Sequence, residues 1–293
     1  MLSKAKSLPR AAAMIMRVCL LIIHANGLRE SPAPPRAPRR AVLGGILTAP
    51  HVARAQSPYD AAFAASTKLD ADAFYAAHPY RSASDVLDYI EKCAAPGDAN
   101  AVLQAFEYFG KKYPMYSIGA TKGKILDSAV ATAKPRRIVE VGSFLGYSAV
   151  RMAAKLPGDG TLACVEGNPE FARTAEGIVA RAGLSDRVRF FVGLASDEIP
   201  SVAQTIGRAD LVFLDHCKEC YAPDLGRMEA AGLVAKGTIV VADNVVFPGA
   251  PGYLDKVAAP AYATVLRPAP YEAVGWETRW KEVDDAMSVS TRL

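Results

Sequence analysis

The sequence predicts an α/β fold with a mostly parallel sheet and helices on both of its faces. Two observations lead to this prediction. From residue 137 onward, short apolar runs bounded by glycine alternate with segments of helical spacing. Such runs are typical of parallel strands that are covered on both sides. The 293 residues, 51% of them hydrophobic, suffice for one such domain with an extension, or for two small domains.

Three helices are predicted before the first strand. Apolar residues recur at helical spacing in SASDVLDYIEKCAA (82–95). Asp98 is the candidate N-cap of the second helix, and Pro135 closes the third, KGKILDSAVATA. VGWETRW and MSVSTRL, near the end of the chain, are candidates for a hairpin at the sheet edge. Strands are predicted at 137–142, 162–167, 188–193, 211–216 and 238–244, and helices follow the first four.

The basic character of the chain is confined to its first 57 residues. They hold nine Lys or Arg and one acid, a net charge of 9 − 1 = +8. The other 236 residues hold 25 basic and 29 acidic side chains, or −4. This mildly acidic body gives no reason to expect nucleic acid as a partner. We expect a leader or membrane anchor at 1–57, a linker at 58–83 and a globular domain at 84–293.

The leader allows four interpretations. Arg39-Arg40 before a short apolar run that ends on Ala-Arg-Ala is typical of a bacterial export signal. The same stretch is rich in Arg and poor in acid, like a transit peptide. The apolar segment 11–27 is interrupted by Arg17 and falls short of the about 20 residues of a membrane span, but an anchor near 11–25 remains an interpretation. A mis-assigned start codon is the fourth.

The first two strands end in residues suited to a nucleoside. Gly142 and Gly146 frame a turn after Glu140 and would let the backbone approach a ligand closely, although the full G-x-G-x-x-G pattern is absent. Glu166, 26 residues after Glu140, ends the second strand, where an acid typically accepts hydrogen bonds from ribose hydroxyls. An ordinary tight turn and an exposed cap are the alternatives. Together the two signals favour a nucleoside-containing cofactor.

The fourth and fifth strands end in oxygen-bearing side chains. Asp215 ends one strand and Asp243-Asn244 ends the next, a set that suits Mg²⁺. Lys218 lies about one turn past Asp215; beside a divalent cation its ammonium form is disfavoured, so it can act as a base. Helix caps and a solvated lysine are the alternatives. Cys217-x-x-Cys220 is a weak redox or zinc signal, which we interpret as two thiols on a turn.

Several long motifs resemble the catechol O-methyltransferase family. The similarity runs from about residue 84 to 285. It implies an S-adenosylmethionine- and Mg²⁺-dependent enzyme that methylates one hydroxyl of a catechol, on a seven-stranded Rossmann-like sheet whose last strand is antiparallel. The motifs are PGDANAVLQAFEYFGKKYPMYSIGATKGKILDSAV, IVEVGSFLGYSAVRMA, VEGNPE, LVFLDHCKECY and GTIVVADNVVFPGAPGYL.

The resemblance also implies roles for particular residues. Asp215, Asp243 and Asn244 would be metal ligands, and Lys218 the general base. Substrate contacts would come from Lys218, Asn244, Pro248 and Glu277. The cofactor would be held by Ile118, Glu140, Gly142, Tyr147, Ser148, Glu166, Ser196, Asp215 and His216.

The chain departs from the family around the substrate. Cys217 and Pro114 stand where the family has aromatic walls, and only the wall at Pro248 is kept. The carboxylate for the second hydroxyl falls on Arg279 in strict register, with Glu277 and Glu282 nearby. An O-methyltransferase for another vicinal diol or phenolic acid, or a cofactor-binding relative without turnover, are therefore the alternative functions.

Partners and location follow from these expectations. We expect a monomer that binds a small catechol or diol, and membrane contact only through the leader. S-adenosylmethionine is made inside cells, so the expected location is membrane-anchored or organelle-targeted, with export as the alternative.

Overall fold

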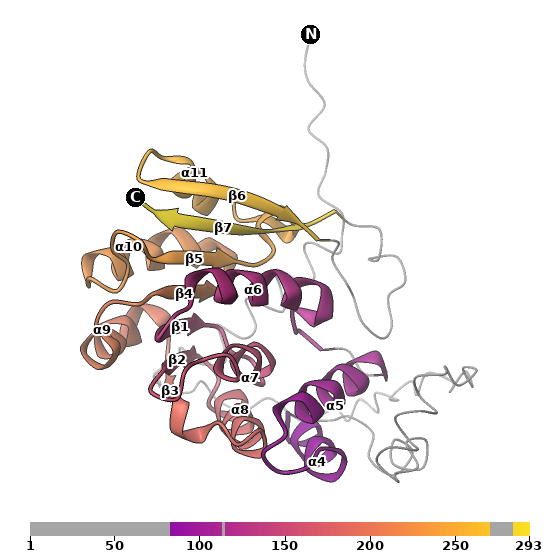
Figure 1. Ribbon diagram of the computed structural model, residues 1–293. Coiled ribbons are helices and arrows are strands. Elements are labelled where there is room, and N and C mark those ends of the chain that lie inside the picture. Colours follow the sequence, from indigo (N-terminus) through magenta and orange to yellow (C-terminus); the bar gives the residue numbers. More distant parts are fainter. Residues whose placement is uncertain (1–82, 113–114, 270–283) are drawn as a thin grey trace, which may run out of the picture.

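The computed structural model describes residues 83–112, 115–269 and 284–293 (Figure 1). Within these ranges the chain forms one seven-stranded sheet of order β3-β2-β1-β4-β5-β7-β6. β1 to β5 are parallel, and β7 is antiparallel to both of its neighbours. The predicted mostly parallel, seven-stranded sheet with an antiparallel last strand is confirmed. The strands are β1 (Arg137–Val141), β2 (Thr161–Glu166), β3 (Val188–Val192), β4 (Leu211–Leu214), β5 (Ile239–Ala242), β6 (Tyr262–Pro268) and β7 (Ala286–Arg292).

The predicted hairpin at the sheet edge is wrong in one respect. MSVSTRL does form most of β7 and pairs antiparallel with the edge strand, but the partners of β7 are β5 and β6 and not the predicted segment. Its partner on the edge side is β6, Tyr262–Pro268, which was not predicted as a strand. This edge strand is largely exposed and has no continuous apolar run, so it lacks the signal that marks the buried strands. VGWETRW lies outside the described residues.

Helices cover both faces of the sheet, as predicted. Alternate residues of a strand point to opposite sides, so Ile138 and Phe213 pack into one apolar cluster while Val139 and Val212 pack into the other. The first cluster is covered by α4 (Ala83–Cys93), α5 (Ala99–Lys112), α6 (Gly119–Ala133), α7 (Tyr147–Ala153) and α8 (Pro169–Arg181). The second is covered by α9 (Ala195–Ile206), α10 (Tyr221–Ala230) and α11 (Pro251–Ala258), of which α11 was not predicted. Short turns of helix are η1 (Ser185–Arg187), η2 (Lys218–Cys220) and η3 (Val245–Gly249).

Local signals set the ends of several helices. The backbone N–H of Ala101 donates to Asp98 Oδ1 at 2.9 Å, which confirms the predicted N-cap of α5. Lys134 adopts the left-handed conformation, φ 45°, and ends α6 just before Pro135. The carboxamide of Asn168 caps α8 by accepting from two backbone N–H groups.

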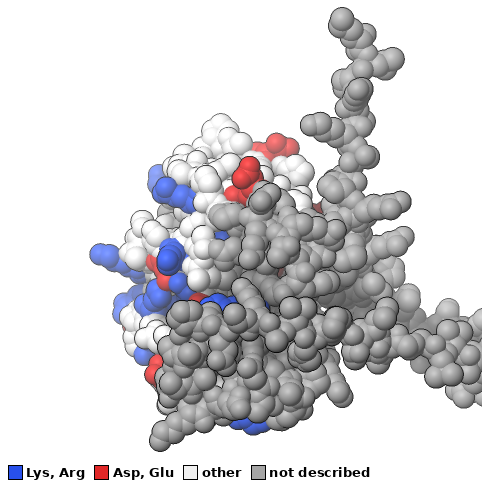
Figure 2. Space-filling view, turned by 90° about the vertical axis from the view of Figure 1, so that its right-hand side faces the viewer, with Lys and Arg blue, Asp and Glu red and all other residues white. Residues whose placement is uncertain are grey.

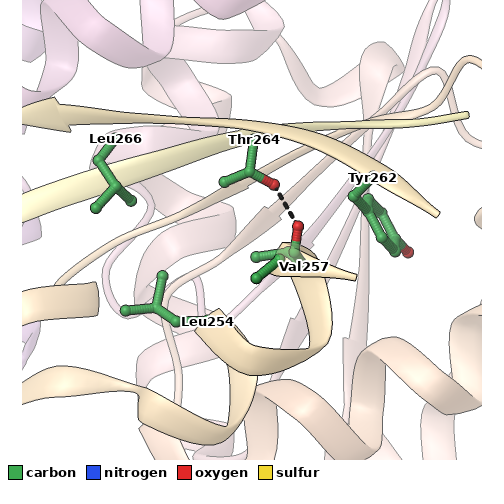
Figure 3. A pocket seen from close by; sticks show the side chains of 6 residues that line it. Leu254, Val257, Tyr262, Thr264 and Leu266 are labelled. Carbon is green, nitrogen blue, oxygen red and sulfur yellow. Dashed lines mark hydrogen bonds between the residues drawn. The ribbon is translucent and has the colours of Figure 1, made fainter. Parts of the chain in front are cut away.

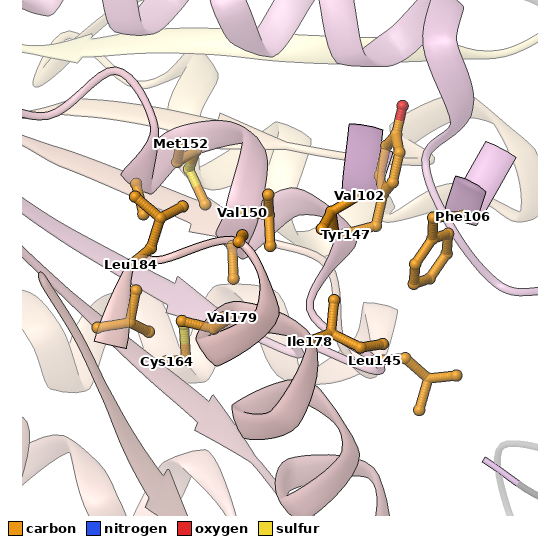
Figure 4. Packing of buried hydrophobic residues seen from close by; sticks show 14 of the residues in the cluster. Val102, Phe106, Leu145, Tyr147, Val150, Met152, Cys164, Ile178, Val179 and Leu184 are labelled. Atoms are coloured by element: carbon orange, nitrogen blue, oxygen red, sulfur yellow. The ribbon is translucent and has the colours of Figure 1, made fainter. Parts of the chain in front are cut away.

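Buried side chains pack α7 against α5 and α8. Phe106 of α5 and Tyr147 of α7 are buried with ring centroids 5.2 Å apart, and Val150 and Ile178 belong to the same cluster (Figure 4). Full burial of a side chain such as Phe106 stabilises the fold by about 2 kcal/mol relative to exposure. This layer therefore holds the first turn of α7 against α5.

The described ranges contain no helix that is long and apolar enough to cross a membrane. The predicted leader (1–57) lies outside them, as does nearly all of the predicted linker (58–83). Where described residues are visible in Figure 2, basic, acidic and uncharged side chains lie next to one another.

Candidate active site

Four residues stand in a row across neighbouring strand ends. Each directly follows, or ends, a strand whose last residues are paired in register with the next strand. Backbone N–H groups of three of them donate to the adjacent strand at 2.9 to 3.0 Å. Neighbouring strands lie about 4.8 Å apart, so the two aspartates come side by side as the sequence predicted. The row is Glu166, Gly142, Asp215 and Asp243.

Lys218 is held against Asp215. Its Nζ donates to Asp215 Oδ1 at 2.8 Å and to the hydroxyl of Tyr221 at 2.6 Å. That hydroxyl in turn donates to the backbone oxygen of Asp243 at 3.2 Å, and burial raises the pKa of Tyr221. The side chain of Lys218 is only 14% exposed. The lysine is therefore fixed at the strand ends and is not a solvated helix lysine.

Asp243 is buried beside a second lysine. Lys122 Nζ, from α6, lies 2.7 Å from Asp243 Oδ1. Burial raises the pKa of Asp243 to about 6, and the charge of Asp215 acts in the same direction, while Lys122 opposes both. Burial alone would lower the pKa of Lys122, but Asp243 and Asp285 raise it above its ordinary value. Two carboxylates that repel each other at one edge form a site that a cation would stabilise.

Asn244 completes the predicted oxygen set. It adopts a left-handed conformation, φ 56°, which Asn tolerates better than most residues. Its Nδ2 donates to Asp285 Oδ2 at 2.9 Å, so the amide oxygen is the atom left for a ligand. In the described part of the chain, no group of three or more His, Cys, Asp or Glu is arranged to hold a metal. The predicted set has two carboxylates and one amide, and these hard oxygen donors fit Mg²⁺ by their chemistry.

Glu140 is a fully buried acid in β1. Its Oε2 lies 3.1 Å from the thiol of Cys164, the residue paired with it on β2. No hydrogen-bond partner of its Oε1 is found among the described residues. Burial raises the pKa of Glu140 to about 7, although hydrogen bonds from Ser148 and Cys164 act against this. A buried carboxylate oxygen without a partner indicates a place where a polar ligand atom would fit.

We expect Glu140→Gln to change how stability depends on pH. The pKa of Glu140 is about 7 in the fold against an ordinary 4.5. Its contribution to stability is therefore full below pH 4.5 and is lost as the pH rises through 7. That difference in pKa corresponds to about 3 kcal/mol. In urea unfolding without cofactor, the free energy of unfolding of the variant should rise relative to that of the parent by up to this amount between pH 5 and pH 8. A difference that stays constant over that range would contradict the prediction.

The turn after β1 is tight and is held by Glu166. The backbone N–H of Phe144 donates to Glu166 Oε2 at 2.8 Å, and that of Asn168 donates to Oε1 at 2.9 Å. Burial raises the pKa of Glu166, and hydrogen bonds from backbone N–H groups, including those of Ser143 and Gly167, oppose this. Gly142 has φ +86°, and a Cβ there would lie 2.5 Å from the backbone oxygen of Asp215. The glycine thus lets the turn after β1 (142–146), the candidate cofactor turn, touch the strand ends that carry Asp215, Asp243 and Asn244, the candidate metal edge.

His216 directly follows Asp215 and has a half-buried imidazole. Its Nε2 lies 2.9 Å from Asp224 Oδ2, and Nδ1 has no partner among the described residues. Burial lowers the pKa of His216, and Asp224 opposes this. In the neutral tautomer that donates from Nε2 to Asp224, Nδ1 is an acceptor available to a ligand.

Comparison with known proteins identifies the family. A family model described as O-methyltransferase matches residues 98–264, more than half of the chain. The chain belongs to the O-methyltransferase family. The resemblance to catechol O-methyltransferases is confirmed as well. The relatives include catechol O-methyltransferase B of Danio rerio, 40% identical over 59% of this chain and 66% of its own length, and catechol O-methyltransferase of Mus musculus, 38% identical over 58% and 65%. The chain thus spans just under two thirds of the length of these relatives.

Solved structures share the fold of this O-methyltransferase. An O-methyltransferase from Bacillus cereus in complex with SAH has a TM-score of 0.55 and 24% identity, and the match covers 71% of this chain and 97% of that one. TomG from Streptomyces achromogenes, in complex with SAM, has a TM-score of 0.52 and 24% identity over 76% and 99%. The predicted Rossmann-like architecture is confirmed.

The remaining predicted site residues of this O-methyltransferase are more scattered. Ile118 is buried at the start of α6, and Ser196 lies in the first turn of α9 with its Oγ bonded to Asp197. The hydroxyl of Tyr147 donates to Glu107 of α5 at 2.6 Å, so its polar end is engaged away from the strand ends. Pro248 is exposed in η3. Glu277, Arg279, Glu282 and Pro114 lie outside the described residues.

Three residues of the site were missed from the sequence: Lys122, Tyr221 and Asp285. Lys122 shares a helix face with the buried Leu126, and a lysine on an apolar stripe was the available signal. Tyr221 follows Lys218 at a spacing of three, which places it on the same side of a helical turn. Asp285 precedes an apolar strand and carried no local signal.

A groove between α11 and β6 is not the active site. Its volume is about 380 Å³, and apolar side chains dominate its walls (Figure 3). Thr264 closes one side by donating to the backbone oxygen of Val257 at 2.7 Å. None of the predicted catalytic, metal or cofactor residues lines it. Its walls are Leu254, Val257, Ala258, Tyr262, Thr264 and Leu266.

Proposed function

We propose that this O-methyltransferase uses S-adenosylmethionine and Mg²⁺ to methylate one hydroxyl of a catechol-type substrate. The observation that carries the proposal is the placement of Lys218 against Asp215, beside Asp243 and Asn244 at the same edge of the sheet. The catechol O-methyltransferases among its relatives support the choice of substrate. The SAM and SAH complexes of proteins with this fold support the cofactor.

The residues at this edge would have two roles, binding of the metal and acceptance of the substrate proton. Asp215, Asp243 and Asn244 would hold Mg²⁺, which when bound lowers the pKa of the hydroxyl that it coordinates. Lys218 would accept the proton of that hydroxyl at Nζ. Hydrogen bonds with Asp215 and Tyr221 keep Nζ at the edge, within reach of anything bound at Asp215.

The other half of the site would position the methyl donor. Glu166 would hold the ribose, and the turn at Gly142 would let the backbone approach the cofactor. S-adenosylmethionine would supply the methyl group from its sulfonium sulfur, and Lys218 would take the proton of the substrate hydroxyl. Most of the acceleration would come from holding the two reactants in line. Asn244, Pro248 and Glu277 are the proposed contacts to the substrate.

A transfer assay with labelled S-adenosylmethionine and a panel of catechols, other vicinal diols and phenolic acids tests this proposal. We expect transfer to catechols that disappears when Mg²⁺ is chelated and returns when it is restored. Transfer confined to other acceptors would favour the broader diol enzyme. Binding of the cofactor without transfer to any acceptor would favour a relative without turnover.

We further propose that residues 1–57 are a targeting leader or membrane anchor and 58–83 a linker to a monomeric methyltransferase domain at 84–293. Relatives named transmembrane O-methyltransferase favour an anchored form. An exported enzyme would be separated from its methyl donor, so an organelle is the other proposed location. Mass spectrometry of the mature N-terminus and light scattering of the purified protein test these points; cleavage with secretion, or a stable dimer, would contradict them.

A further inference from the structure

Asp285 is a buried carboxylate in front of β7 that touches most of the metal edge. Its side chain has no exposed surface. Oδ2 accepts hydrogen bonds from Lys122 Nζ at 2.6 Å and from Asn244 Nδ2 at 2.9 Å. Oδ1 accepts from the backbone N–H groups of Phe247 at 2.9 Å and Val246 at 3.3 Å.

Each of these contacts leads to a proposed metal ligand or to the segment that carries one. Lys122 bridges Asp285 to Asp243, because the same Nζ lies 2.7 Å from Asp243 Oδ1. The hydrogen bond from Asn244 places the amide nitrogen toward Asp285, so the amide oxygen lies on the other side. The two backbone bonds hold the first turn of η3, directly after Asn244. One carboxylate thus restrains Asn244 directly, Asp243 through Lys122, and the backbone that follows Asn244.

We propose that Asp285 is a positioning residue that sets the orientation of Asn244 and Asp243 for the divalent cation. This inference rests on the proposed function. A carboxylate only accepts hydrogen bonds, so an amide that donates to it must present its oxygen on the other branch. Residues that orient metal ligands in this way affect metal affinity strongly, by about 10- to 100-fold when they are changed.

Asp285 could instead be only a counter-ion for Lys122, and the two roles predict different results. A counter-ion acts through its charge, so its effect vanishes when both members of the pair are neutralised. A positioning residue acts through its acceptor atoms, so its effect remains. The double variant Lys122→Met/Asp285→Asn keeps the net charge of the site. Asp243 loses its contact with Lys122 in this variant but still experiences the charge of Lys218.

The test is calorimetric titration of the purified full chain with Mg²⁺, free of substrate. Asp285→Asn should bind Mg²⁺ about 10- to 100-fold more weakly than the parent. Asp284→Asn is the matched control. Asp284 is the neighbouring residue and its side chain is exposed, so this variant loses the same charge without a buried contact. Its Mg²⁺ affinity should be unchanged. SAH affinity and the melting temperature of each variant report separately on the cofactor half and the fold.

The double variant decides the case, including if Asp285→Asn alone does not fold. Weak Mg²⁺ binding by the double variant, with SAH affinity intact, supports the positioning role. Affinity equal to that of the parent would overturn it and leave the proposed function standing. A parent chain that binds no Mg²⁺ would overturn both this inference and the metal-dependent part of the proposed function.

Discussion

Replacement of Lys218 by alanine is expected to lower turnover by about 10²- to 10⁴-fold, the usual contribution of a positioned general base. The cause would be the loss of the group that takes the substrate proton, because Nζ is the amine held at Asp215. Cofactor affinity should not change, since Lys218 lies at the metal edge and not among the residues that form the turn after β1. The measurement is single-turnover methyl transfer together with SAH titration.

Two controls separate the loss of the base from a loss of structure. Lys236→Ala removes an exposed lysine outside the helices and strands and should leave turnover as it is. The pH profile of Lys218→Ala should lose the limb that reports deprotonation of the base, whereas a merely distorted site would keep that limb at a lower rate. Turnover of Lys218→Ala close to that of the parent would remove Lys218 from the mechanism.

The strand ends were predictable from sequence because two simple rules combine there. Buried parallel strands are recognisable in a sequence as apolar runs, and ligands bind at the carboxyl ends of such strands. Reading the residue after each run therefore gave Glu166, Gly142, Asp215 and Asp243 without knowledge of the strand order. The structure adds the register that puts them in a single row.

The supporting residues could not be found in the same way. Asp285 and Lys122 are 163 positions apart, and their pairing depends on how α6 and the start of β7 meet over β5. Neither residue follows an apolar run, so the rule that found the ligands does not apply to them. β6 was missed for a related reason, since an exposed edge strand needs no apolar run. Sequence patterns report burial of a segment, whereas these contacts depend on which segments become neighbours.

The second large effect is expected for Gly142→Ala, which should abolish SAH binding and destabilise the fold by on the order of 4 kcal/mol. The left-handed backbone at φ +86° costs a residue with a side chain about 1 to 3 kcal/mol. The added Cβ would also lie 2.5 Å from the backbone oxygen of Asp215, and relief of such overpacking costs a similar amount. Both atoms are held by strand ends, so the turn after β1 must move away from β4.

Gly232→Ala separates these two costs. Gly232 also has a positive φ, +75°, but a Cβ there would meet nothing within 4 Å. It should therefore show the backbone cost alone, about 1 to 3 kcal/mol, and bind SAH normally. Urea unfolding and SAH titration of both variants measure the difference, which is the contribution of the contact between Gly142 and Asp215. Equal stability of the two alanine variants, with SAH bound by both, would mean that the cofactor turn and the metal edge are not packed against each other. The contact between Gly142 and Asp215 could then not set the distance between a bound methyl donor and Lys218.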